Sequence, residues 1–107
     1  WSQVAGLVNR GAWEKIVLVG NSFVKETIKK FDFVQKTDLV TIDFNPSINE
    51  IIKELKEKLK DKLKGTEVAL SIASGNGKEH MALISALLQL PVGIKFTALT
   101  KEGISKF

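Results

Sequence analysis

Apolar residues follow one another almost without interruption at two places in this chain, residues 16–20 and residues 68–72. An apolar run of this length is typical of a strand that is buried on both faces, as in a parallel sheet. Two further runs, residues 39–44 and residues 94–99, alternate apolar with polar positions, which suits a strand at the edge of a sheet. The pattern therefore predicts four strands, two central and two at the edges.

The most regular helical pattern lies between the second and third of these strands. Its apolar residues recur at a period near ~3.6 and form a single stripe. They are Ile48, Ile51, Ile52, Leu55, Leu59 and Leu63. Ser47 and Glu50 have the spacing of a capping box, and Pro46 prevents the helix from continuing upstream. The pattern predicts a helix that begins after Ser47 and ends at Gly65.

Two shorter helices are predicted nearer the N-terminus. Val4, Leu7 and Val8 have helical spacing, and Gly11 is placed to end that segment. Directly after the first strand, Ser22 is placed to cap a second helix. The apolar residues of that second helix are Phe23, Ile28 and Phe31.

The last predicted helix, residues 81–90, is apolar around most of its girth. Such a helix is buried on two sides, and a chain of 107 residues offers few elements to cover the second side. Two explanations are equally open: a second copy of the chain packs against this helix, or a further part of the same protein does. The first explanation predicts a homodimer through residues 81–90.

Strands that alternate with helices predict an α/β fold, with a parallel sheet of four strands and right-handed crossovers. A strand order of 2-1-3-4 puts the two most apolar strands in the centre. The first and third strands are then neighbours, and ligands bind such sheets where the connections diverge, beyond the carboxyl ends of the strands. Residues 20–22 and 74–78 follow these two strands and are expected to meet there.

Length and composition narrow the class of protein. The 107 residues suit one domain, residues 1–107, and because the chain starts at Trp1 rather than Met we expect it to be trimmed or cut from a longer protein. The absence of cysteine and the single histidine exclude disulfides, thiol catalysis, zinc–thiolate sites and histidine clusters, and we expect neither a metal ion nor a cofactor. No apolar run reaches the ~18 residues of a membrane helix, and no signal peptide is visible, so we expect a cytoplasmic location.

The net charge of +4 comes largely from residues 53–64, where six lysines alternate with three acidic residues. A solvated helix face with i,i+4 pairs, such as Glu54 with Lys58, explains this pattern better than a nucleic-acid interface does. A single arginine and 7% aromatic residues argue further against recognition of duplex nucleic acid. Many lysine and glutamate residues without cysteine are consistent with a thermophilic source.

The turn between the third strand and the last helix is the strongest candidate for a ligand site. Its residues are Ser74, Gly75, Asn76, Gly77 and Lys78. A strand, a glycine-bearing turn and a helix start direct backbone N–H groups at one point, where they bind an anion. The positive charge of Lys78 opposes the helix dipole unless an anion compensates it. The spacing matches neither a Walker A loop nor a dinucleotide-binding motif, and a plain strand-to-helix turn is the alternative.

Other candidates surround this turn. Asn21 and Ser22 can donate hydrogen bonds to a phosphate or a ribose, and Ser22 can equally be a helix cap alone. His80 is either a general acid or base or, as is more common for a lone histidine at a helix start, a surface or packing residue. Asp43 and Asn45 end the second strand, where an acidic residue can bind a ribose hydroxyl, but ordinary loop polarity explains them equally well. No Ser-His-Asp set, carboxylate pair or cluster of metal-binding carboxylates is visible.

Two segments of the chain resemble a CARF domain, the CRISPR-associated Rossmann-like fold that senses cyclic oligoadenylates. One segment is the apolar strand followed by residues 20–22, and the other is the strand that leads into residues 74–82. The family's pattern in the second segment is a pair of small or glycine residues, then a threonine or small residue, then a lysine and, soon afterwards, an apolar residue. The matching residues are Gly75, Gly77, Lys78 and Met81. Asn76 interrupts the glycine pair, and the specific part of the resemblance spans about fifteen residues.

The resemblance implies a Rossmann-like three-layer sandwich and a homodimer packed through the helix after Lys78, with a ring of adenylates bound across the dimer axis. The chain would then be a regulatory domain of CRISPR-linked antiviral defence that binds a cyclic or linear oligoadenylate. The ligand contacts would be Gly20, Asn21, Ser22, Ser74, Gly75, Asn76, Gly77, Lys78 and His80.

Related ring nucleases imply an enzymatic alternative for this chain. In them the ribose 2′-hydroxyl attacks the neighbouring phosphate without a metal ion. A lysine at the position of Lys78 stabilises the developing charge, and a hydroxyl at the position of Ser22 orients the ligand. Another Rossmann-like nucleotide-binding domain is the remaining alternative.

Overall fold

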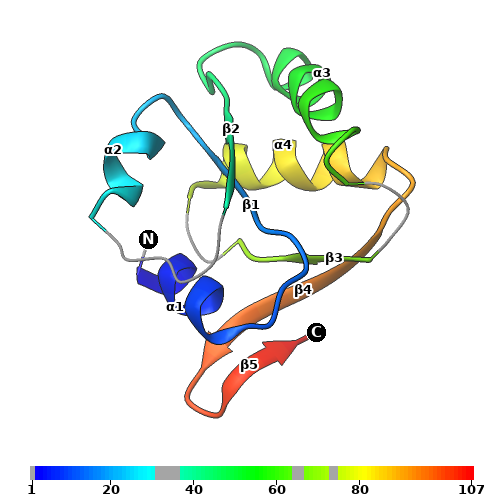
Figure 1. The fold of residues 1–107 in the computed structure, drawn as a ribbon. Helices are drawn as coiled ribbons and strands as arrows, with labels where there is room; N and C mark the ends of the chain where they lie inside the picture. The colour runs from blue at the N-terminus through cyan, green and yellow to red at the C-terminus, as the bar shows by residue number, and fades with distance from the viewer. Residues whose placement is uncertain (1, 31–36, 64–66, 73–74) are drawn as a thin grey trace.

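The computed structural model describes residues 2–30, 37–63, 67–72 and 75–107 of the chain. These residues form four helices and five strands, which alternate up to a C-terminal hairpin (Figure 1). The elements are α1 (Ser2–Arg10), β1 (Val17–Gly20), α2 (Val24–Ile28), β2 (Asp38–Thr41), α3 (Ile48–Leu59), β3 (Glu67–Leu70), α4 (Gly77–Leu88), β4 (Gly93–Thr100) and β5 (Gly103–Lys106).

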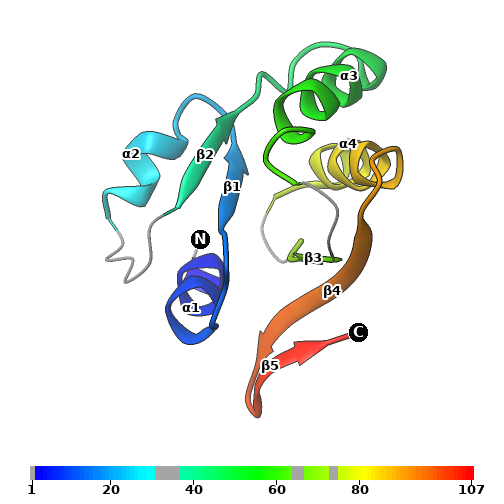
Figure 2. The same ribbon diagram turned by 45° about the vertical axis from the view of Figure 1, so that its right-hand side comes forward.

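The strands form two separate sheets (Figure 2). β1 and β2 pair in parallel, with Leu18 opposite Leu39. β3 and β4 also pair in parallel, and β4 then pairs with β5 in the antiparallel direction. The fold is therefore a small mixed α/β arrangement, and the predicted Rossmann-like three-layer sandwich with a four-stranded parallel sheet of order 2-1-3-4 is wrong. In the described part of the chain, β1 and β3 are not hydrogen-bonded neighbours.

The parallel pairs β1–β2 and β3–β4 are those of the predicted order, and the hydrophobic core explains why the apolar pattern wrongly predicted that β1 pairs with β3. Buried side chains from β2, from the residue that follows β2, and from α3, β3 and α4 form one cluster that joins the two sheets. Its members are Val40, Ile42, Ile51, Leu55, Leu59, Leu70, Ala82, Ala86 and Leu87. An apolar run indicates only that its side chains are buried away from water. In this fold they are buried without pairing of β1 with β3. Neither strand is buried on both faces as expected, because only Leu18 in β1 and only Leu70 in β3 are fully buried.

β4 is the central strand of its sheet and not the predicted edge. Its first half pairs with β3, and its second half, from Thr97 to Thr100, pairs with β5. β5 was not predicted from the sequence. The turn that leads into β5 places Gly103 at a φ of +107°, a conformation that favours glycine.

The predicted helices are present, but one of their predicted caps is wrong. Ser47 Oγ accepts a hydrogen bond from Glu50 N at 3.4 Å, so the predicted start of α3 is confirmed. α2 begins after Phe23, which makes no side-chain cap, and Ser22 is therefore not the cap of this helix. The predicted end of α3 at Gly65 is wrong, because the helix ends at Leu59 and residues 60–62 form a turn, so Leu63 lies outside the helix. Gly65 itself lies outside the described residues, as does Phe31. None of the described helices has the length and apolar character that a membrane crossing requires.

α1 packs against the second half of β4. The side-chain amide of Gln3 accepts a hydrogen bond from Leu99 N at 2.6 Å and donates one to Leu99 O at 3.4 Å. A Cβ atom on Gly6 would lie 2.6 Å from Leu99 Cδ2, so this glycine allows the close approach. The Gln3 amide thus satisfies backbone groups of β4 beyond the end of β3.

Candidate functional site

The segments that follow β1 and β2 lie at the same end of this parallel pair (Figure 1). Ile42 N donates a hydrogen bond to Gly20 O at 2.8 Å, which extends the pairing one residue beyond β2. Asn21 and Ser22 therefore begin at the same edge as the loop from Asp43 to α3. This is the edge at which parallel sheets commonly bind ligands.

Lys78 connects this edge to the start of α4. Its Nζ donates hydrogen bonds to Phe44 O and to Pro46 O, each at 2.9 Å. Both acceptors belong to the β2–α3 loop, so one ammonium group ties this loop to the first turn of α4. A lysine ammonium has three donors. These two contacts therefore leave one N–H direction of an exposed side chain for a further acceptor.

The turn before α4 requires glycine at one of its two glycine positions. Gly75 has a φ of +99°, and a Cβ atom there would lie 2.9 Å from Glu79 Oε2 and 3.2 Å from His80 Nε2. Gly77 has open space where a Cβ would be. Gly75 therefore lets the chain turn tightly against the side chains of the first helical turn. His80 is half-buried there and packs beside this glycine.

The N-termini of α3 and α4 lie close together, and the Lys78 side chain connects them. Asn76 Oδ1 caps α4 by accepting a hydrogen bond from Glu79 N at 2.9 Å, as Ser47 caps α3. At the other end of the same helix pair, Lys56 Nζ donates to Gln89 Oε1 at 3.0 Å. The N-terminus of α4 therefore lies beside that of α3, and the C-terminal parts of the two helices also lie side by side, so the helices run in the same direction. Their positive dipole ends and the Lys78 ammonium favour an anion at this edge, partly offset by Glu79.

The structure brings the sequence-predicted residues together only in part. Gly20, Asn21 and Ser22 lie at the edge of the β1–β2 pair, whereas Lys78 makes its direct contacts with the loop after β2. Asn21 Oδ1 accepts a hydrogen bond from Phe23 N at 2.9 Å, and the Ser22 side chain is exposed. The predicted contact Ser74 lies outside the described residues.

The two carbonyl groups that hold Lys78 were not predicted from the sequence. Every residue has a backbone carbonyl oxygen, so no sequence pattern indicates that those of Phe44 and Pro46 bind Lys78. Asp43, considered as a ribose ligand, has a local role here: its Oδ1 accepts a hydrogen bond from Asn45 N at 3.0 Å. This contact shapes the loop that carries both carbonyls.

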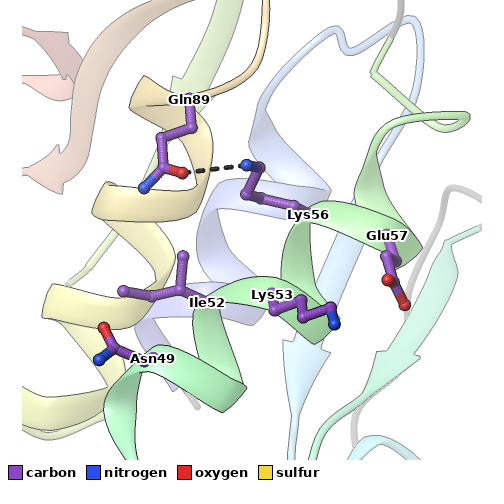
Figure 3. Close-up of a pocket in the computed structure, with 6 residues that line it drawn as sticks. All are labelled: Asn49, Ile52, Lys53, Lys56, Glu57 and Gln89. Atoms are coloured by element: carbon purple, nitrogen blue, oxygen red, sulfur yellow. Dashed lines mark hydrogen bonds between the residues drawn. The ribbon is translucent and has the colours of Figure 1, made fainter.

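Away from this edge, a metal site and a surface hollow are the other kinds of site to consider. Among the described residues, no group of three or more histidine, cysteine, aspartate or glutamate side chains is arranged to hold a metal ion. A surface hollow of about 420 Å³ lies between α3 and α4 (Figure 3). It is lined by Asn49, Ile52, Lys53, Lys56, Glu57 and Gln89. Gln89 follows the last residue of α4, so the hollow extends to the helix end opposite Lys78 and does not include the predicted site.

Comparison of the chain with protein-family models, with curated proteins and with solved structures found no match.

Proposed function

We propose that this chain is a regulatory domain that binds a cyclic oligoadenylate through its phosphodiester groups. The observation that carries the proposal is the position of the Lys78 ammonium. It is held by two backbone carbonyls of the β2–α3 loop, so that it connects this loop to the start of α4. A cation fixed in this way is already oriented for a phosphate, so little ordering remains to be done on binding.

The choice of an oligoadenylate rests on the resemblance of residues 20–22 and 74–82 to CARF domains. It does not rest on the sheet, which is not the four-stranded sheet of that fold. Lys78 at the first turn of α4 lowers the stability of an isolated helix, because it opposes the dipole. A ligand that repeats one negative charge per nucleotide would compensate this charge. In this proposal the ligand is a cytoplasmic second messenger of antiviral defence.

A second copy of the chain is part of the proposal. Met81 and Leu88 of α4 are 61% and 71% exposed, and their spacing of seven residues puts them on one face of the helix. Exposed apolar side chains of this size mark interaction surfaces when they occur together. Met81 lies three residues after Lys78, so a homodimer through α4 would bring two Lys78 sites close to one another. A ring-shaped ligand could then contact both.

The experiment is a thermal-shift screen of cyclic oligoadenylates against AMP, ATP and NAD. A ligand that binds only the folded state at about 100 times its Kd stabilises that state by about 2.7 kcal/mol. For a domain of this size the melting temperature rises by roughly 10 °C. We expect such a shift with a cyclic adenylate, and we expect Lys78→Ala to abolish it. The matched control Lys101→Ala removes an exposed lysine from the β4–β5 turn and should keep the shift.

The outcomes of this screen separate the rival functions. An intact ring recovered after incubation with a chelator supports a sensor, whereas linear products support a metal-independent ring nuclease that uses Lys78 and Ser22. A shift with a mononucleotide or dinucleotide alone would indicate another kind of nucleotide-binding domain. No shift with any adenylate ring at large excess would overturn the proposal.

A further inference from the structure

We propose that Phe23 is the residue on which a nucleobase of the ligand stacks, an inference that rests on the proposed function. Phe23 is 70% exposed, although burial of a phenylalanine side chain is strongly favourable. The next residue, Val24, is 2% exposed and anchors α2 to the protein. The chain thus buries the smaller side chain and presents the larger aromatic one to solvent.

The backbone of Phe23 is held in place from both directions. Its N–H donates to Asn21 Oδ1 at 2.9 Å. Its carbonyl oxygen accepts hydrogen bonds from Thr27 Oγ1, Glu26 N and Thr27 N, each at 3.1 Å. A ring carried on a fixed backbone loses little conformational freedom when a ligand packs against it. The backbone that carries the Phe23 ring is therefore preorganised.

Phe23 lies in the chain just after β1, at the end of the β1–β2 pair from which the Lys78-binding loop also starts. Phe23 follows Gly20 by three residues, and Gly20 O accepts the hydrogen bond from Ile42 N. Two residues beyond Ile42, Phe44 O holds the Lys78 ammonium. An exposed aromatic ring thus follows β1, and the loop that binds a cation follows the neighbouring strand β2 at the same end of the parallel pair. Base–aromatic stacking is a common source of affinity in single-stranded nucleotide recognition.

This placement distinguishes Phe23 from other exposed aromatic side chains. Phe107 is also 70% exposed, but it follows β5 and its N–H donates to Phe96 O in the β4–β5 sheet. Phe107 is therefore an aromatic control of equal exposure in a different sheet. A stacking role predicts that substitution of Phe23 changes ligand affinity and that substitution of Phe107 does not.

The test is titration of cyclic tetra-adenylate into the wild-type protein and into four variants, Phe23→Ala, Phe23→Leu, Phe23→Trp and Phe107→Ala. We expect Phe23→Ala to raise Kd by roughly 5- to 150-fold, which corresponds to the loss of one stacked base. Phe23→Trp should keep the affinity within about threefold, because it retains an aromatic face. Phe23→Leu should resemble Phe23→Ala, because an apolar side chain without a flat π-face does not restore stacking. Urea unfolding should be nearly unchanged for the alanine variant, since Phe23 is largely exposed.

A spectroscopic readout separates stacking from general apolar contact. A ring in which 2-aminopurine replaces adenine should lose fluorescence on binding to the wild type and to Phe23→Trp, but much less on binding to Phe23→Ala. If Phe23→Ala binds as tightly as the wild type while Lys78→Ala does not bind, the stacking role is wrong and the proposed function stands. If Phe23→Leu retains full affinity, the contact is apolar only and the stacking role is again wrong. If the wild type binds no adenylate ring, both proposals are wrong.

Discussion

α3 and α4 have the same length and pack against each other, yet they present different side chains to solvent. Each has twelve residues, and each begins at a side-chain oxygen that accepts a hydrogen bond from the third amide of the helix. The exposed residues of α3 are Asn49, Glu50, Lys53, Glu57 and Lys58. The exposed residues of α4 are Gly77, Lys78, Met81 and Leu88. α3 therefore shows the usual surface of a solvated helix, whereas α4 shows apolar residues and a cation at its positive end.

This difference distinguishes surface features of the helix pair that the fold explains from features that it does not explain. The buried stripe of α3 and its outward charges are explained by the fold alone. Met81 and Leu88 of α4 are exposed apolar side chains that packing in the described part of the fold does not explain. Lys78 holds the β2–α3 loop and also places a positive charge at the positive end of the helix dipole. We infer that α4 is the helix through which the protein meets a ligand and a second copy.

Truncation of a leucine in each helix should give the largest contrast. Leu55→Ala in α3 removes a side chain that is 0% exposed, and we expect a loss of about 2–5 kcal/mol in the free energy of unfolding. Leu88→Ala in α4 removes a side chain that is 71% exposed and should cost about 0.5 kcal/mol or less. Urea unfolding monitored by circular dichroism measures both values. Equal losses at the two positions would mean that the outward face of α4 is packed within a single chain.

The two glycine substitutions at the start of α4 should change the free energy of unfolding in opposite directions. Gly75→Ala forces a Cβ into a positive-φ position against Glu79 and His80, and we expect it to destabilise the fold by roughly 1–2 kcal/mol. Gly77→Ala meets open space and should stabilise by about 0.4–1 kcal/mol, because the unfolded chain loses freedom. Thermal unfolding of the two variants provides the comparison. A stable Gly75→Ala variant would show that the tight turn is not as described.

Removal of the two helix caps should give the smallest difference in the free energy of unfolding. Asn76→Ala and Ser47→Ala each remove one cap, at about 1 kcal/mol. The cap of α4 is shorter, 2.9 Å between Asn76 Oδ1 and Glu79 N against 3.4 Å between Ser47 Oγ and Glu50 N, so Asn76→Ala should cost more. Urea midpoints determined side by side resolve the order. The reverse order would indicate that Asn76 is not the stronger cap.

The sequence predicted local structure where side chains determine it directly. The Ser47 cap, the stripe through Leu55 and the tight turn at Gly75 are encoded in residue types and spacings, and the structure contains each of them. Strand pairing is determined by which backbones meet, and apolar runs do not specify that, so the predicted neighbours β1 and β3 were wrong. The short Lys101-Glu102 turn has no strong hairpin motif, which is why β5 was not predicted.

The candidate site was predictable to the same extent. Lys78 and the loop residues 20–22 were identified because their side chains and spacings are visible in the sequence. The contacts of Lys78 with Phe44 O and Pro46 O were not predictable, since they depend on how the β2–α3 loop lies against α4. Ser22 was expected to cap α2, but Asn21 binds the amide of Phe23 instead. A local hydrogen bond between neighbouring residues thus replaced the expected cap.

Calorimetric titration of the wild-type protein and of Lys78→Ala with cyclic tetra-adenylate examines whether the ammonium held by Phe44 and Pro46 is a phosphate site. We predict saturable binding by the wild type and a Kd at least about tenfold higher for Lys78→Ala, since a charge-assisted hydrogen bond to phosphate contributes more than ~1.4 kcal/mol. Equal affinity of the two proteins, or no binding by the wild type, would contradict this assignment.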